Sequence, residues 1–239
     1  MKKSKCFRTL LPAYILILSG LLLGTYLGGR AVTVISENAP VKNRKCIVID
    51  AGHGGVDGGA ISCTGVLESQ INLEIALKLD DLCHLLGLNT KMIRTTDCSI
   101  YTQGNSIAAK KVSDLKERVR ITNDIENGIL VSIHQNKYAE SRYSGAQVFY
   151  APTDGSSNLA KSIQDAYMES LNSGSNRKIK KADGVYLMQH ITCPGVLVEC
   201  GFLSNPEEET LLRSAAYQQK ICCVIVSACS RFLNTEPSA

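Results

Sequence analysis

The sequence has no surplus of basic charge over most of its length. Its formal net charge of +4 comes from residues 1–45, which hold eight Lys or Arg and one Glu, a balance of +7. The other 194 residues hold 18 basic and 21 acidic side chains, a balance of −3. A nucleic-acid-binding surface needs a basic excess to neutralise phosphates. We therefore expect that no nucleic acid is a partner of this chain.

Nucleotide-binding loops, internal repeats and low-complexity tracts are also missing from the sequence. A glycine-rich segment follows the first strand-like apolar run, but neither G-x-G-x-x-G nor the lysine-containing phosphate-loop pattern is present. With 44% apolar and 20% charged residues, the composition is that of a folded chain rather than a disordered one. About 195 residues follow the basic segment, which is enough for one domain with a full core.

The ten cysteines lack the C-x-x-C spacing that is typical of structural zinc clusters and redox sites. Cys46 and Cys200 fall inside strand-like runs, and Cys222, Cys223 and Cys229 fall in an apolar helical segment. A free cysteine in a protein core behaves as a small hydrophobic residue. We therefore predict that most of these thiols are buried and unpaired.

The N-terminal segment has the pattern of a membrane-targeting sequence. Residues 1–9 carry four basic side chains, whereas residues 10–29 carry no charge. About 20 apolar residues span a bilayer as a helix, and the basic flank stays in the cytoplasm. A cleavable signal peptide is the alternative, but no small-x-small cleavage site follows Gly29. We predict a cytoplasmic tail at 1–9, a transmembrane anchor or signal segment at 10–29, a linker at 30–44, an exported domain at 45–234 and a tail at 235–239.

Short apolar runs alternate with helical patterns after residue 45. This alternation predicts a three-layer α/β/α domain with a mostly parallel central sheet of about six strands. The predicted strands are Cys46–Ile49, Thr90–Arg94, Gly128–Ile133, Ala146–Tyr150, Val185–Met188 and Val196–Glu199. Helices are predicted near residues 69–86, 113–125, 158–171 and 220–232, and a further one after the N-cap Asn205. The segment 97–112 is predicted to be a loop, with Ser113 as the N-cap of the helix that follows it.

Three polar residues lie at the downstream ends of separate predicted strands: His53, His134 and Glu199. The carboxyl ends of parallel strands meet at one edge of an open α/β sheet, where ligands and reactive groups gather. A carboxylate that follows the apolar run 196–198 needs a partner, such as a metal ion or a catalytic water. The three residues therefore predict a reactive site at this edge.

Two imidazoles and a carboxylate suit zinc, and three protein ligands leave one position open for water. The spacing leaves three candidates for the third ligand, namely Glu68, Asp50 and Asp57. Asp50 is also a candidate for orienting His53 through a hydrogen bond, or for a turn-capping role.

Four blocks of the sequence resemble the zinc-dependent N-acetylmuramoyl-L-alanine amidases, and they occur in that family's order. They are residues 49–60 (IDAGHGGVDGGA), Glu68, residues 132–136 (SIHQN) and residues 194–205 (PGVLVECGFLSN). The resemblance spans about residues 45–234. Asp57-Gly58-Gly59, residues 144–147 (SGAQ) and the short N-terminal segment without wall-binding repeats look most like the germination-specific, spore-cortex type.

The resemblance implies a role for individual residues. His53, Glu68 and His134 match the family's ligands for one catalytic zinc ion, and Glu199 matches its catalytic glutamate. The implied reaction is hydrolysis of the amide between the lactyl group of N-acetylmuramic acid and L-alanine of the stem peptide. The spore-cortex type further implies formation of muramic δ-lactam, on the outer face of the bacterial cytoplasmic membrane or of the membranes that enclose the forespore.

Substrate contacts and partners follow less directly from the motifs. Asn136, which stands where many members have Asp, and His190 are candidate substrate-binding residues. Arg94 is a candidate for binding stem-peptide carboxylates, whereas Arg118 and Arg120 are expected on a solvated helix face. The expected partners are peptidoglycan, the membrane and an unidentified accessory protein.

Two other functions compete with the amidase interpretation. A zinc peptidase that cuts within the stem peptide would use the same ligands and glutamate, and only the scissile bond separates it from an amidase. A non-catalytic wall-binding module is the second alternative, but such a module has no need of His53, Glu68, His134 and Glu199 together.

Overall fold

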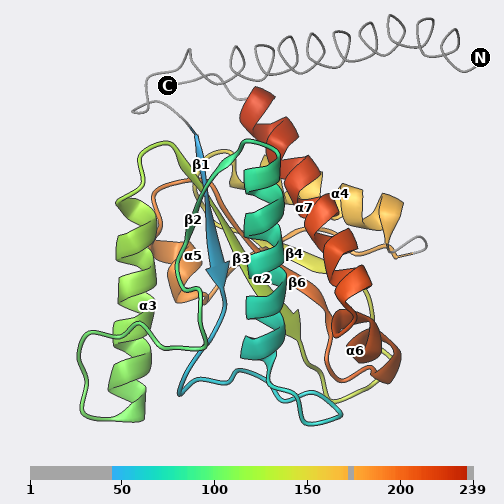
Figure 1. Cartoon of the computed structure of the whole chain (residues 1–239), viewed down its shortest axis with the longest axis horizontal. Coiled ribbons are helices and arrows are strands. Elements are labelled where there is room, and N and C mark those ends of the chain that lie inside the picture. Colours follow the sequence, from blue (N-terminus) through green and yellow to red (C-terminus); the bar gives the residue numbers. More distant parts are fainter. Residues whose placement is uncertain (1–44, 172–174, 236–239) are drawn as a thin grey trace, which may run out of the picture. The chain divides into compact units, whose positions relative to one another are not determined.

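A six-stranded sheet with helices on both faces forms the centre of the computed structural model, which describes residues 45–171 and 175–235 (Figure 1). The strand order is β2-β1-β3-β6-β4-β5, and every neighbouring pair is parallel except β4 and β6. The predicted three-layer, mostly parallel fold is therefore confirmed. The strands are β1 (Cys46–Ala51), β2 (Asn89–Met92), β3 (Gly128–Asn136), β4 (Gln147–Tyr150), β5 (Lys180–Lys181) and β6 (Gly195–Phe202).

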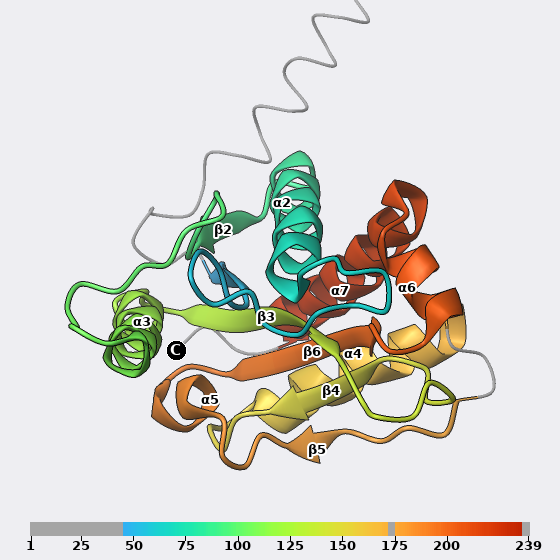
Figure 2. The same cartoon turned by 90° about the horizontal axis from the view of Figure 1, so that it is seen from below.

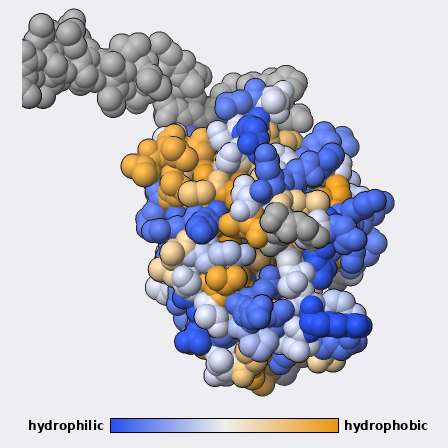
Figure 3. All heavy atoms as spheres, turned by 90° about the vertical axis from the view of Figure 1, so that its right-hand side faces the viewer, coloured by the Kyte–Doolittle hydropathy of each residue, from blue (hydrophilic) through white to orange (hydrophobic). Residues whose placement is uncertain are grey.

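The helices divide between the two faces of the sheet (Figure 2). Helices α2 (Glu68–Leu85), α4 (Ser156–Ser170) and α7 (Ala215–Thr235) cover one face, with the short α6 (Pro206–Leu212) beside α7 and β6. Helices α3 (Ile107–Asn123) and α5 (Tyr186–His190) cover the other face. The outer surface that includes α4 and α7 is largely hydrophilic, with separate apolar patches (Figure 3).

Side-chain alternation along the strands builds a core on each face. Ile47 and Ile49 pack into the cluster beneath α2, α4 and α7, whereas Val48 joins a smaller cluster with residues of α5. Leu197 also belongs to the smaller cluster. Glu199, two residues further along β6, therefore lies on the α3 and α5 side of the sheet, as the alternation predicts.

One predicted element in the last third of the chain is wrong, and one strand there was not predicted. Val185–Met188, predicted as a strand, is not a strand, because Tyr186–His190 forms α5. A four-residue apolar run has no period by which a strand can be told from a helix. In the structure Leu187 and Met188 lie on a helix and pack into the smaller core. The strand that brings the sheet to six is instead β5 (Lys180–Lys181), which pairs with β4.

The start of α3 also differs from the prediction. The helix begins at Ile107, six residues before the predicted start, because the Ser106 hydroxyl accepts a hydrogen bond from the Ala109 amide at 3.2 Å and acts as the N-cap. Ser113 lies inside the helix, where its hydroxyl accepts hydrogen bonds from the amides of Thr102 and Gln103. Ser113 thus stabilises the preceding loop rather than the helix end.

The Asn205 cap is confirmed, since its side chain accepts hydrogen bonds from the amides of Glu207 and Glu208. The other helices agree with prediction apart from their ends. The nine cysteines in the described ranges are free, which confirms the prediction of unpaired thiols there. The prediction that most of them are buried is wrong for the described residues, because only four of the nine are buried, namely Cys83, Cys200, Cys222 and Cys229. Cys63 and Cys223 are exposed, and the other three are half-buried.

The predictions for residues 1–44 lie outside the described residues, and so does most of the predicted tail at 235–239. No helix within 45–171 and 175–235 is both long and apolar enough to cross a membrane.

Candidate active site

The loop after β1 places His53 in an unusual backbone conformation. His53 has φ of 61°, which is uncommon outside glycine, and paired backbone hydrogen bonds between Gly54 and Asp57 close the turn that follows. The Nδ1 atom of His53 lies 3.0 Å from Asp57 Oδ2, and its Nε2 atom lies 3.3 Å from Glu68 Oε2. Asp57 therefore sets the orientation of the ring that faces Glu68.

Glu68 is the first residue of α2, and both of its carboxylate oxygens are held in place. Oε2 accepts a hydrogen bond from the Ala60 amide at 2.9 Å, and Oε1 accepts one from the Gln135 amide at 3.1 Å. Asn72, one turn further along α2, donates a third hydrogen bond to Oε1. These contacts fix the carboxylate between the loop before α2 and the end of β3.

His134 completes a compact cluster with His53 and Glu68. Its Nδ1 atom lies 2.9 Å from Glu68 Oε1, and the two imidazole rings are 4.9 Å apart at 73°. One ligand atom from each of the three residues lies within 4.8 Å of the other two. Burial alone would raise the pKa of Glu68, but hydrogen bonds from both histidines outweigh it and hold that pKa well below its usual range. A charged carboxylate between two imidazoles has the composition of a divalent-metal site.

Glu199 pairs in register with His134 across β6 and β3. Its Oε2 atom is buried and has no hydrogen-bond partner. Burial raises the pKa of Glu199 to about 7, and the charges of His134 and His53 offset only part of that rise. A carboxyl group with a pKa near neutrality can both accept and donate a proton.

Asp50 does not orient His53, in contrast to one of the roles predicted for it. It is buried at 1% exposure, accepts a hydrogen bond from Ser132 at 2.6 Å and forms an ion pair with Arg118. Asp50 is therefore part of the support beneath the site, and Asp57 is the carboxylate that contacts His53 Nδ1.

The prediction that Arg118 lies on a solvated helix face is wrong, because only 3% of it is exposed. Its guanidinium contacts Asp50 and Asp114 and donates to the carbonyl oxygen of His53 at 2.7 Å. Burial lowers the pKa of Arg118, but the two carboxylates outweigh that effect and raise it overall. Arg120, by contrast, is exposed as predicted.

Arg94 has a structural position rather than the predicted contact with substrate. It is buried and donates hydrogen bonds to the carbonyl oxygens of Ala51, Gly52 and Ser69. A fourth hydrogen bond, 3.0 Å long, goes to the carbonyl oxygen of Thr96. The guanidinium therefore holds backbone of the site loop, of α2 and of the segment after β2 together. No feature of the sequence separates this arginine from an exposed one, because the partners are carbonyl groups that every residue carries.

The two predicted substrate-binding residues lie in different surroundings. Asn136 ends β3, two residues beyond His134, and its carbonyl oxygen accepts a hydrogen bond from the Leu203 amide at 2.7 Å. His190 ends α5, where it is exposed, stacks on Tyr186 and lies 2.8 Å from the carbonyl oxygen of that residue. The structure brings Asn136 near the cluster along β3, whereas the His190 ring contacts Tyr186 of its own helix.

Gly52 leaves the space that the His134 ring occupies. A Cβ atom on Gly52 would lie 2.2 Å from His134 Nε2, far inside contact distance. We expect Gly52→Ala to displace the His134 ring and so to lower the metal content of the purified protein severalfold, measured by atomic emission after dialysis.

Gly65→Ala is the matched control, since a Cβ atom there meets nothing within 4 Å. Its φ of +91° makes the alanine strained, so this variant loses stability without reaching the cluster. Equal metal content in Gly52→Ala and the wild type would show that His134 does not need this space.

A mostly parallel α/β sheet with reactive groups at its carboxyl edge defines a class of enzyme domains. Within that class, residues 47–231 match the Amidase_3 family, N-acetylmuramoyl-L-alanine amidase. The chain therefore belongs to the N-acetylmuramoyl-L-alanine amidase family and is an amidase, which confirms the resemblance in its sequence. This assignment selects the amidase from the three functions considered above.

Several known amidases resemble the chain over most of its length. It is 38% identical over 190 residues to the germination-specific N-acetylmuramoyl-L-alanine amidase of Bacillus subtilis, covering 79% of each protein. A solved structure of the CwlD amidase from Clostridioides difficile, in complex with the GerS lipoprotein, superimposes with a TM-score of 0.76 at 37% identity. That match covers 81% of this chain and all of the other. An N-acetylmuramoyl-L-alanine amidase from Clostridium difficile 630 superimposes with a TM-score of 0.72 at 29% identity, covering 82% and 100% of the two chains.

Proposed function

We propose that this amidase uses one zinc ion, held by His53, Glu68 and His134, to hydrolyse the amide between N-acetylmuramic acid and L-alanine in spore-cortex peptidoglycan. Hydrolysis there prepares muramic acid for conversion to its δ-lactam. The observation that carries the proposal is the buried, unpartnered oxygen of Glu199 beside a cluster of two imidazoles and a carboxylate.

The residues present fit a zinc ion. Two neutral imidazoles and one carboxylate form a common ligand set for catalytic zinc, and Asp57 supports His53 from outside as carboxylates do in such sites. A zinc ion held this way supplies Lewis acidity, which polarises a carbonyl and lowers the pKa of water to about 7.

Glu199 is the proposed general base and acid of the reaction. In its charged form it accepts a proton from the water that attacks the amide carbonyl. It then donates this proton to the alanine nitrogen, so the carbon–nitrogen bond breaks and a neutral amine leaves. A pKa of about 7 suits both transfers, because neither form of the carboxyl group is strongly favoured near neutral pH.

The spore-cortex assignment rests on the relatives. The Bacillus subtilis relative is a germination-specific amidase, and the Clostridioides difficile structure is a complex with a lipoprotein. We propose that the chain likewise has a lipoprotein as its accessory partner. We also propose that it is exported and anchored on the outer face of the cytoplasmic membrane, or on the membranes around the forespore.

Cortex analysis of spores tests the proposed biological role. A strain that lacks the gene is complemented with either the wild type or Glu199→Gln, and its cortex muropeptides are analysed by mass spectrometry. We expect muramic δ-lactam only with the wild type. Normal δ-lactam content in the uncomplemented strain would contradict the cortex assignment.

A further inference from the structure

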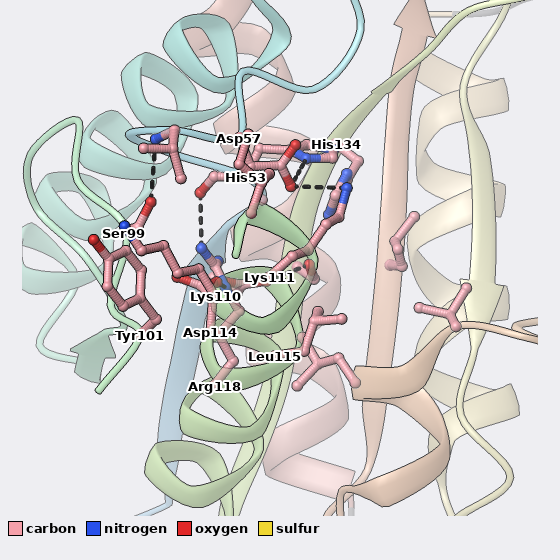
Figure 4. Close-up of a pocket in the computed structure, with 18 residues that line it drawn as sticks. His53, Asp57, Ser99, Tyr101, Lys110, Lys111, Asp114, Leu115, Arg118 and His134 are labelled. Atoms are coloured by element: carbon pink, nitrogen blue, oxygen red, sulfur yellow. Dashed lines mark hydrogen bonds and ion pairs between the residues drawn. The ribbon is translucent and has the colours of Figure 1, made fainter. Parts of the chain in front are cut away.

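A cavity of about 310 Å³ opens against the histidines of the cluster, and both His53 and His134 contribute to its wall (Figure 4). Much of the remaining wall is apolar and comes from the side of the sheet that carries α3 and α5. Ile107 and Leu115 of α3, Leu187 of α5 and Leu197 of β6 supply this surface. A group bound in the cavity therefore lies next to the reactive centre, in surroundings that strengthen electrostatic interactions.

Lys110 of α3 lines the cavity with a positive charge that no carboxylate neutralises among the described residues. The side chain is half-buried, and its ammonium group lies over the ring of Tyr101, 5.0 Å from the centroid. Figure 4 shows the two side chains together on one side of the cavity. An ammonium group that is partly removed from water is stabilised by an anion, so the position is prepared for a negatively charged ligand.

The neighbouring lysine differs in this respect. Lys111 Nζ lies 3.1 Å from Asp57 Oδ2, and that carboxylate also contacts His53. Its charge is already compensated within the protein. Arg118, which also lines the cavity, is paired with Asp50 and Asp114. Among the described residues of this lining, Lys110 is thus the cation left to select an anionic substrate.

The proposed substrate has its carboxylates on one side of the scissile bond. The lactyl carboxyl group is consumed in the amide, so the sugar side carries no charge close to the reaction. The stem peptide carries a free carboxylate on the residue after L-alanine, about one residue length (roughly 3.5 Å along the chain) from the alanine.

We infer that Lys110 binds the carboxylate of the stem-peptide residue that follows L-alanine, while the apolar wall contacts the alanine side chain. This specificity rests on the proposed function, because it places the leaving peptide in the cavity. Lys110 is a specificity-determining residue that does not touch the scissile amide.

Two synthetic substrates test the inference. They are N-acetylmuramoyl tripeptides in which the γ-carboxyl group of the second residue forms the next peptide bond. The α-carboxyl group of that residue is free in one substrate (D-isoglutamate) and is a neutral amide in the other (D-isoglutamine). The full-length protein in detergent is assayed with zinc as wild type, Lys110→Gln and Lys116→Gln. Lys116 is an exposed lysine of the same helix that does not line this cavity, so its variant removes the same charge elsewhere.

We expect the wild type to have a KM about fivefold to tenfold lower for the acidic substrate, the size of a charge-assisted hydrogen bond at a half-exposed site. Lys110→Gln is expected to lose this preference, to retain its kcat within about twofold, and to cleave the neutral substrate like the wild type. Lys116→Gln should keep the preference.

Three results would overturn the inference. They are an unchanged acidic preference in Lys110→Gln, no preference in the wild type, and an equal loss on both substrates. Cleavage of neither substrate by the wild type would instead refute the proposed function itself, and the inference with it.

Discussion

Glu199→Gln is expected to lose about two to four orders of magnitude in kcat, the contribution of a positioned general acid–base. The amide keeps the shape of the side chain but does not accept the proton from water. Zinc content should equal that of the wild type, because His53, Glu68 and His134 form the cluster without Glu199. The measurements are steady-state turnover of a muropeptide and zinc per chain.

The thermal stability of Glu199→Gln separates chemistry from folding. Because Oε2 of Glu199 is buried without a partner, a neutral amide costs no more to bury than a carboxylate, and the Tm should not fall. Glu207→Gln, on the exposed first turn of α6, is the control for the loss of one negative charge. Full activity in Glu199→Gln would remove Glu199 from the mechanism.

Arg118→Met is expected to lower the free energy of unfolding by about 3–5 kcal/mol, the cost of leaving a buried charge without its partner. The variant leaves the Asp50 carboxylate without its ion-pair partner. Asp50 is 1% exposed and keeps only the Ser132 hydroxyl as a side-chain partner. It also removes the hydrogen bond to the carbonyl oxygen of His53. Activity should therefore fall together with stability, measured by urea unfolding and turnover.

Arg120→Met is the matched control on the same helix. Arg120 contacts Glu117 and Asp124, but 58% of its side chain is exposed, so water screens both ion pairs. Its loss should cost less than about 1 kcal/mol. If the two variants were equally stable, the Asp50–Arg118 pair would not be the support that we describe.

The candidate site was largely predictable because its residues sit at strand ends. His134 and Glu199 follow apolar runs that form neighbouring parallel strands, and the pairing places them in register. His53 follows β1 in the same way. Spacing alone leaves Asp50 and Asp57 as alternatives to Glu68, and only the family resemblance selects Glu68. The structure places Glu68 between the two histidines. The choice depended on how the loop between β1 and α2 folds back, which no spacing rule describes.

The errors have a common physical cause, which is that the missing information was tertiary. Arg118 has the sequence neighbours of a surface residue, and only the approach of α3 to Asp50 makes it buried. Val185–Met188 is predicted as a strand because so short an apolar run shows no helical period. The core that fixes it as part of a helix is assembled from segments far apart in the sequence. Lys180–Lys181 pairs with β4 although its charged side chains remain exposed.

The products of one reaction test the central claim most directly. The full-length, zinc-loaded protein is incubated with purified muropeptides that retain their sugars, and the products are identified by mass spectrometry. Our account predicts free peptides that begin with L-alanine, together with sugars that have lost the entire stem. Shortened stems that remain attached to the sugar would contradict it, because the scissile bond would then lie within the peptide.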